Sequence, residues 1–476
     1  MTPTTSSPAT PLPPRRRTVL AGIGAVPLAA GAATATTAAP RPEPGDGHAP
    51  ATLLRGAELV LTMDPALGTG DLGTLERADV LMRDGRIAGV GRRLPAPAGA
   101  RVVDVSGMLV LPGFVDLHNH LWQSSIRGGC HTQDLYGWLA DCNRATLPKI
   151  SPEDMYRFVR LAALDALQAG VTTLVDWVLH PIGYDTSERY IRALDRTGLR
   201  FVYAMAHNTA DLDLVPRVKK NLLDPLPLAS AQVAVHAGMD RLDPLRRSRE
   251  VARDLGLMIN SHVLEHRGDR AQEPIRSLRT ADAFGPDLLM NHAIHLTDDE
   301  IAQVAEADVR VAHCPLSNMR LGSGIIRLPE LKRRGVRAGL GHDGGTNDTS
   351  DMFGVMKAAV GLQRALHQDA DVHPTIPAVL RMATLGGAEC LRMADRVGSL
   401  TPGKRADVLV LDPGTLNFAP RFDWLGQIVL NGQPGNVSHV YVDGRARKVR
   451  GKLVDVDPAE VVREAERAAA RVRAGG

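Results

Sequence analysis

The chain has 476 residues, of which 44% are hydrophobic and 23% are charged, and its net charge is +3 at pH 7. This composition is ordinary for a globular enzyme, and the length suffices for one large barrel plus a smaller domain. The charge is too small to indicate a nucleic-acid or membrane-surface partner, and no basic stripe with interleaved aromatic residues occurs.

The first fifty residues differ in composition from the rest of the chain. Arg15, Arg16 and Arg17 precede the weakly apolar stretch AGIGAVPLAAGAATA, which ends in small residues. This layout is typical of a cleavable export signal, and the paired arginines resemble the twin-arginine variant. The alternatives are a disordered tail or a short membrane anchor, although the apolar run is short for a membrane span. We therefore expect residues 1–50 to be a signal peptide and linker, and the protein to be exported (periplasmic or extracellular) with no membrane span after cleavage.

Short alternating strands are expected near both ends of the remaining chain. The expected strands are Ala57–Met63, Ala78–Met82, Ile87–Val90, Arg405–Leu411 and Val437–Val442. Asp84-Gly85 and Asp443-Gly444 are tight-turn signals of β-hairpins. We predict a small composite β-sandwich domain built from residues 51–108 and 396–455, followed by a C-terminal helix or tail over residues 456–476.

Residues 109–395 alternate between strand-like and helical patterns. The strand-like runs are Leu109–Leu117, Thr172–Trp177, Arg200–Met205, Gln232–His236, Leu257–Ser261, Leu288–Asn291, Val309–Ala312 and Val336–Gly341. Ser151 opens the first long helix as an N-cap, with a proline and two acidic residues in the first turn. This alternation predicts an α/β fold, a parallel (β/α)8 barrel of the TIM type, with its chemistry at the carboxyl ends of the strands.

Candidate metal ligands stand at the ends of these strands. They are His118 and His120 after the first strand, His262 and Glu265 after the fifth, His292 after the sixth and Asp343 after the eighth. His118 and His120 are two residues apart, so their side chains point to the same face of the strand. Imidazoles together with a carboxylate suit Zn²⁺, with an open position for a water molecule that the ion activates.

Several motifs resemble those of the amidohydrolase superfamily, in the branch that holds cytosine, guanine and methylthioadenosine deaminases and the s-triazine hydrolases. The motifs are PGFVDLHNH, SHVLE, NHAIHL, VAHCPLSN, GHDGG and GSLTPGKRADVLVLD, within roughly residues 51–450. The resemblance implies that the ligands of a single metal ion are His118, His120, His262 and Asp343. It also implies that Glu265 moves protons to the ring nitrogen and that His292 orients and polarises the attacking water and the substrate. In the mechanism that we expect, Asp343 relays the proton of that water.

The fourth strand reads AQVAVHAG and lacks the lysine that bridges two metals in binuclear relatives. The resemblance therefore implies one divalent ion, Zn²⁺ or alternatively Fe²⁺. His236 stands where related deaminases contact substrate, and Trp122 and Gln123 follow the histidine pair at the entrance. These three residues are candidate substrate contacts.

The leading hypothesis is a metal-dependent hydrolase of carbon–nitrogen bonds other than peptide bonds, which deaminates an amino-substituted N-heterocycle. Cyclic amide hydrolysis or hydrolytic dehalogenation at the same site is an alternative, and a catalytically silent binding protein is another. The expected partners are a small-molecule substrate and further copies of the chain in a homo-oligomer. Cys130 and Cys142 could form a disulfide, which the sequence does not decide.

Overall fold

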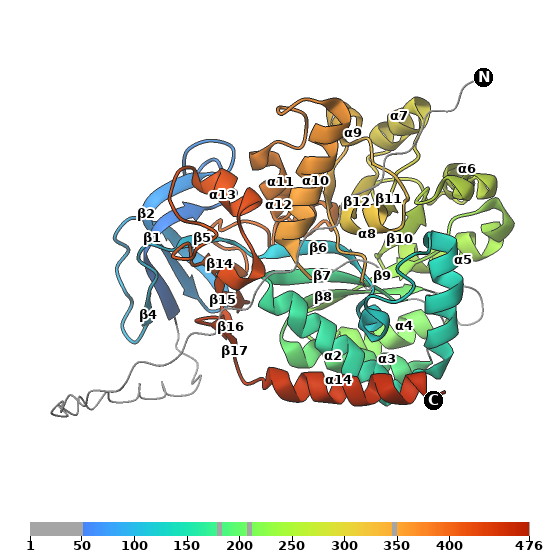
Figure 1. Cartoon of the computed structure of the whole chain (residues 1–476), viewed down its shortest axis with the longest axis horizontal. Coiled ribbons are helices and arrows are strands. Elements are labelled where there is room, and N and C mark those ends of the chain that lie inside the picture. The colour runs from blue at the N-terminus through green and yellow to red at the C-terminus, as the bar shows by residue number, and fades with distance from the viewer. Residues whose placement is uncertain (1–50, 179–182, 207–211, 345–349, 476) are drawn as a thin grey trace, which may run out of the picture. The chain divides into compact units, whose positions relative to one another are not determined.

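Among the residues that the structure describes (51–178, 183–206, 212–344 and 350–475), eight parallel strands form one sheet in chain order from β6 to β13. The strands are β6 (Phe114–Asn119), β7 (Val171–Val178), β8 (Arg200–Ala206), β9 (Ala229–Ala234), β10 (Met258–Val263), β11 (Leu288–His292), β12 (Arg310–His313) and β13 (Ala338–Leu340). Figure 1 shows this computed structural model, in which helices surround the strands. The predicted α/β barrel of the TIM type is confirmed. The predicted export signal, residues 1–50, lies outside the described residues.

The predicted strand from Leu109 to Leu117 is in fact two strands that belong to two sheets. β5 (Leu109–Pro112) pairs with strands of the second sheet, whereas β6 begins the barrel. The break falls at Gly113, where a Cβ atom would lie 1.9 Å from Oγ1 of Thr172. Pro112 has no N–H for a ladder, and only glycine fits the close approach, so the chain changes sheets here.

The predicted helix after Ser151 is confirmed as α2 (Pro152–Gln168), and the Ser151 side chain accepts a hydrogen bond from the Asp154 N–H. The other α-helices are α1 (Leu135–Trp138), α3 (Tyr184–Thr197), α4 (Leu214–Val218), α5 (Leu242–Asp254), α6 (Pro274–Thr280), α7 (Asp298–Glu306), α8 (Pro315–Arg320), α9 (Leu328–Arg333), α10 (Met352–His367), α11 (Ile376–Met382), α12 (Leu385–Cys390), α13 (Trp424–Leu430) and α14 (Pro458–Arg473). Within the described residues, none of these helices combines the length and the apolar composition that crossing a membrane requires.

The second sheet draws its strands from both ends of the chain (Figure 1). Besides β5, its described strands are β1 (Ala51–Leu61), β2 (Thr74–Arg83), β3 (Arg86–Gly91), β4 (Arg101–Asp104), β14 (Val408–Leu411), β15 (Val437–Val442), β16 (Arg445–Val449) and β17 (Lys452–Leu453). Both predicted hairpins are present, at Asp84-Gly85 and Asp443-Gly444. The predicted separate β structure built from both ends of the chain is confirmed. Its described strands belong to one hydrogen-bonded sheet, and the predicted domain bounds, 51–108 and 396–455, stay a prediction.

The central strands of this sheet contribute to two apolar cores. In β14, Leu409 and Leu411 pack into the core that extends over the barrel, while Val408 and Val410 pack into the core of the composite sheet. Alternate residues of a strand face opposite sides, so one strand serves both cores. This shared packing attaches the composite sheet to the barrel that carries the candidate site.

Candidate active site

Asp116 organises the end of the first barrel strand. Its carboxylate accepts hydrogen bonds from the backbone N–H of His118 (3.2 Å), the backbone N–H of His342 (3.0 Å) and the Asn119 side-chain amide (2.7 Å). Its second oxygen also lies 2.9 Å from Nδ1 of His342. Asn119 and His342 are therefore held by Asp116, and this carboxylate joins the first and eighth strand ends.

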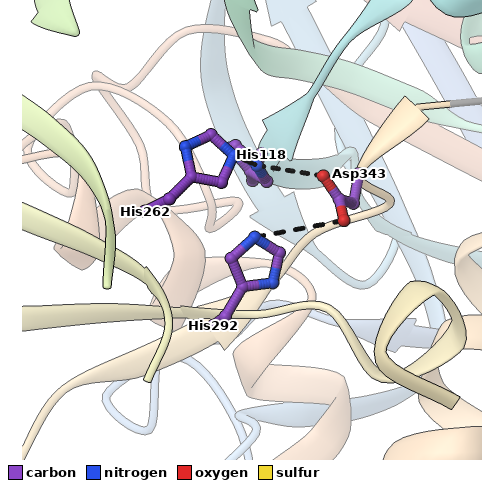
Figure 2. Close-up of side chains that lie close together, drawn as sticks. All are labelled: His118, His262, His292 and Asp343. Carbon is purple, nitrogen blue, oxygen red and sulfur yellow. Dashed lines mark hydrogen bonds and ion pairs between the residues drawn. The ribbon is translucent and has the colours of Figure 1, made fainter. Parts of the chain in front are cut away.

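Histidine and aspartate side chains from the ends of several barrel strands lie close together, and Figure 2 shows four of them, His118, His262, His292 and Asp343. Nε2 of His118 lies 3.1 Å from Nε2 of His262 and 3.1 Å from Oδ1 of Asp343. Nε2 of His120 lies 3.3 Å from each of the same two atoms. The four predicted ligands are thus brought together, with four donor–donor separations between 3.1 and 3.3 Å.

His292 also approaches this cluster, and its donor atoms fall within 4.8 Å of those of His118, His262 and Asp343. Two alternative sets of four donors are therefore conceivable, one with His120 and one with His292. A tetrahedral zinc ion with bonds of about 2.0–2.1 Å requires separations of about 3.3 Å between its ligand atoms. The distances from His120 meet this requirement, whereas Nε2 of His292 lies 4.0 Å from Asp343, so we favour His120 in the ligand set.

The imidazole of His120 is held in a form suited to metal binding. Its Nδ1 lies 2.6 Å from the backbone carbonyl oxygen of Trp177. A carbonyl oxygen only accepts, so Nδ1 carries the proton and Nε2 presents a lone pair to the cluster. The backbone of Trp177, at the end of β7, is a contributor that the sequence did not reveal.

The protonation states of the cluster also suit a cation. Burial lowers the pKa of the His118 imidazole and holds the pKa of His262 well below its ordinary value. Burial alone would raise the pKa of Asp343, but the imidazoles of His292, His118 and His120 outweigh it and hold this pKa well below its ordinary value. Neutral imidazoles and an ionised carboxylate are the forms that bind a divalent metal. The donor set therefore fits one such ion.

Glu265 and His292 lie beside the cluster and are both buried. Nε2 of His292 is 3.5 Å from the Glu265 carboxylate, and Nδ1 of His292 is 3.1 Å from the Asn318 amide nitrogen. Burial and the nearby charges of Asp343 and Asp269 raise the pKa of Glu265 well above its ordinary value, and burial lowers the pKa of His292 to about 3. Oε1 of Glu265 has no hydrogen-bond partner among the described residues, so it is available to a bound molecule.

A cavity of about 280 Å³ opens onto the cluster. Its lining includes His120, Glu265 and Asp343, together with the predicted substrate contacts His236 and Gln123. Trp122 is placed differently, since it is 1% exposed, packs in the apolar core and is not among the lining residues of this cavity. The structure therefore brings two of the three predicted substrate contacts to the cavity.

A sequence model of the amidohydrolase family matches residues 109–447. A 5-methylthioadenosine/S-adenosylhomocysteine deaminase from Pelotomaculum thermopropionicum is 29% identical over 429 residues, which cover 84% of this chain and 96% of the relative.

Two solved structures have the same fold. A zinc-bound adenosine deaminase from Xanthomonas campestris superposes with a TM-score of 0.79 at 27% identity, covering 89% of this chain and 98% of its own. An atrazine chlorohydrolase from Arthrobacter aurescens in complex with zinc has a TM-score of 0.79 at 23% identity, covering 88% of this chain and 100% of its own. At 23% identity, the similarity to the atrazine chlorohydrolase shows a shared fold only.

Proposed function

The chain belongs to the amidohydrolase family, and we propose that it hydrolytically deaminates an amino-substituted N-heterocycle, with adenine nucleosides as the first substrates to test. The reaction replaces the exocyclic amino group with oxygen from water and releases ammonia. The names of the deaminase from Pelotomaculum thermopropionicum and of the adenosine deaminase from Xanthomonas campestris support this substrate class.

One observation carries the proposal, namely the position of Glu265 in the lining of the cavity, beside the donor cluster. Its carboxyl group is buried, lines the cavity and lies 3.5 Å from His292. A carboxyl group whose pKa is raised can keep a proton at neutral pH and deliver it to a ring nitrogen. Metal binding alone would not require such a group.

We propose that His118, His120, His262 and Asp343 hold one divalent ion, with zinc as the preferred ion and iron as the alternative. When bound, the ion supplies Lewis-acid activation of a water molecule. The imidazole and carboxylate donors of this chain and the zinc in the related adenosine deaminase structure support zinc.

The proposed roles of the remaining groups follow from their positions. Glu265 donates a proton to the ring nitrogen next to the carbon that is attacked. His292, which is neutral, orients the attacking water and the substrate from beside the cluster. Asp343 accepts one proton of the water and passes it to the departing amino group, so that ammonia leaves neutral. The remaining hydroxyl proton returns to Glu265 as the product carbonyl forms, which restores the starting protonation of both carboxyl groups.

The test is a coupled ammonia assay on the zinc-loaded protein with adenosine, 5'-deoxyadenosine, cytosine and guanine. A chlorinated triazine and a cyclic amide are included, because dehalogenation and ring opening would use the same site. Ammonia release that disappears in an Asp343→Ala variant would support the proposal. Chloride release or ring opening without ammonia from any amino-heterocycle would contradict it, and no turnover of any compound would favour a binding protein.

Export and self-association are further proposals. A disulfide links Cys130 and Cys142 in the structure, and disulfides persist in oxidising compartments, which supports export of the folded enzyme. Leu416 and Phe422 are large apolar side chains with exposures of 100% and 96%, and such side chains can form an interface between copies in a homo-oligomer.

A further inference from the structure

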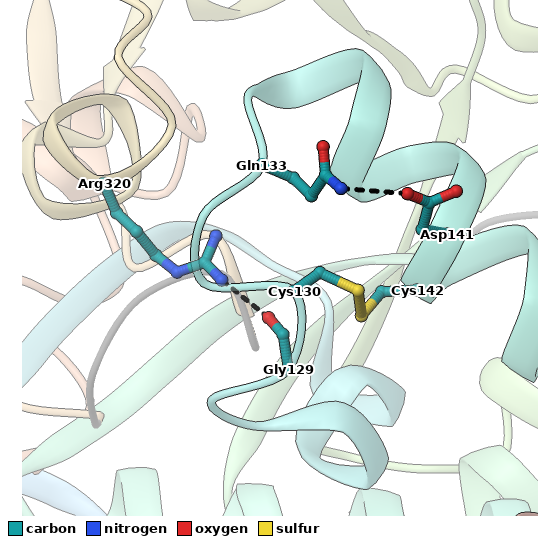
Figure 3. Close-up of a disulfide and its surroundings, with 6 residues drawn as sticks. All are labelled: Gly129, Cys130, Gln133, Asp141, Cys142 and Arg320. Carbon is teal, nitrogen blue, oxygen red and sulfur yellow. Dashed lines mark hydrogen bonds between the residues drawn. A yellow bond between two sulfur atoms is a disulfide. The ribbon is translucent and has the colours of Figure 1, made fainter.

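A disulfide closes a short segment that covers one side of the cavity. Cys130 and Cys142 are joined, with their Cα atoms 6.1 Å apart, and the segment between them contains α1 (Figure 3). We call residues 130–144 the disulfide segment. It lies in the connection between β6 and α2, after the 3₁₀ turn Leu121–Ile126 that follows the histidine pair of the site.

The disulfide segment has a small apolar core of its own. Leu135, Trp138 and Cys142 are buried together with Leu321, which follows α8. Leu135, Trp138 and Leu321 also line the cavity. The wall of the cavity and the core of the disulfide segment are therefore made of the same side chains, so displacement of the segment would change the cavity.

Polar contacts attach the disulfide segment to the barrel at two places. The Arg320 guanidinium donates a hydrogen bond to the carbonyl oxygen of Gly129 (2.7 Å), just before the first cysteine (Figure 3). The Tyr136 hydroxyl donates to the carboxylate of Asp269 (2.6 Å), which lies in the connection after β10. Both contacts are hydrogen bonds at the ends of long side chains. The disulfide restrains the path of the segment covalently, and with it the cavity wall.

Asn143, the residue after the second cysteine, has an unusual environment. It is 0% exposed and belongs to the cavity lining. Neither the oxygen nor the nitrogen of its side-chain amide has a hydrogen-bond partner among the described residues. A buried polar group without a partner destabilises a protein by roughly 1–3 kcal/mol. We therefore expect a bound ligand to form the missing hydrogen bonds of the Asn143 amide.

We propose that Asn143 is a specificity-determining residue that hydrogen-bonds a neutral substrate group able to donate and accept, such as a hydroxyl, and that the Cys130–Cys142 disulfide positions it. The inference rests on the proposed function and deepens it, because it describes the part of the substrate away from the carbon that is attacked. An amide offers one acceptor and two donors, which matches a hydroxyl and not a purely anionic group.

The first experiment compares adenosine with 9-ethyladenine, which has the same ring without sugar hydroxyls. Asn143→Leu should lower the preference of the enzyme for adenosine, measured as the ratio of the two kcat/KM values, by roughly tenfold. The melting temperature of the ligand-free variant should not fall, because the substitution removes an unpaired buried amide. Gln133→Leu is the control, since Gln133 lies in the same segment and bonds to Asp141 but does not line the cavity.

The second experiment removes the disulfide by Cys130→Ser together with Cys142→Ser. Hydrogen exchange should become faster in residues 126–144 and stay unchanged in β10, and KM for adenosine should rise while metal content and kcat stay within about twofold. Treatment of the wild-type protein with a dithiol should give the same change, and the double variant should not respond to it.

Three outcomes would overturn the inference. They are an unchanged preference in Asn143→Leu, a melting temperature that falls by several degrees in that variant, and unchanged exchange in the double cysteine variant. Absence of ammonia release by the wild-type protein concerns the proposed function instead. In that case binding alone tests the inference, through the rise in melting temperature of the wild-type protein with adenosine and with 9-ethyladenine. An equal rise with the two compounds, or no rise with either, also overturns the inference.

Discussion

Asp343 contacts His118 through both its backbone and its side chain. Its backbone N–H donates a hydrogen bond to the carbonyl oxygen of His118 (2.8 Å), and its Oδ1 lies 3.1 Å from Nε2 of the same residue. The first and last strands of the barrel thus meet where two of the proposed ligands lie. Asp343 adopts a left-handed backbone conformation with φ of 67°, which costs energy for a non-glycine residue and is typical of functional sites.

This relationship predicts the metal content. The purified protein should hold close to one equivalent of zinc, measured by elemental analysis. Asp343→Ala and His118→Ala should each lower the affinity of the protein for zinc at least tenfold, because each removes a donor from the cluster. Asn431→Ala, at the end of α13 and away from the cluster, should leave the metal content unchanged. Two tightly held ions per chain would contradict the prediction of a single ion, which rests on the absence of a lysine from the fourth strand.

Glu265→Gln should separate catalysis from metal binding. The substitution keeps the shape of the side chain but removes the transferable proton, so kcat should fall by at least about a hundredfold. Metal content and KM should remain close to those of the wild-type protein, as measured by elemental analysis and steady-state kinetics. Loss of the metal would instead make Glu265 a ligand, and unchanged turnover on a deaminase substrate would exclude it from the reaction.

A buried ion pair connects the barrel to the composite sheet. Nε and Nη2 of Arg200, in β8, lie 2.9 and 3.0 Å from the two carboxylate oxygens of Asp407, just before β14. Arg200→Met would leave Asp407 buried without this partner, and such a change costs about 3–5 kcal/mol. The thermal midpoint should fall clearly, whereas Arg276→Met, which breaks an exposed pair with Glu273, should change it little. Equal midpoints for the two variants would show that the ion pair does not hold the two parts together.

The export hypothesis has its own test. Residues 1–50 fused to a reporter that is active only after export in the folded state should carry that reporter across the membrane. Replacement of both Arg16 and Arg17 by Lys should stop transport, because the twin-arginine pathway recognises the guanidinium pair. Transport that continues in the double variant, measured in cell fractions, would reject the twin-arginine assignment.

The sequence by itself determined the barrel and placed the candidate ligands at the ends of its strands. Alternation of strand and helix patterns depends on neighbouring residues, and the carboxyl ends of parallel strands necessarily meet at one end of a barrel. Six candidate residues could therefore be grouped before their distances were known, and the resemblance to the amidohydrolase motifs selected His118, His120, His262 and Asp343 among them. The same local logic identified Ser151 as a helix cap and both hairpin turns.

Only the tertiary structure decided which neighbours face the cavity and which face the core. Trp122 and Gln123 are adjacent, yet the first is packed in the core and the second lines the cavity. They lie in the 3₁₀ turn Leu121–Ile126, where successive side chains point about 120° apart, and the packing of that turn decides which of them faces the cavity. The Cys130–Cys142 disulfide and the unpaired Asn143 depend on the path of one connection over the barrel. Long-range packing sets that path, and no periodic pattern in the sequence records it.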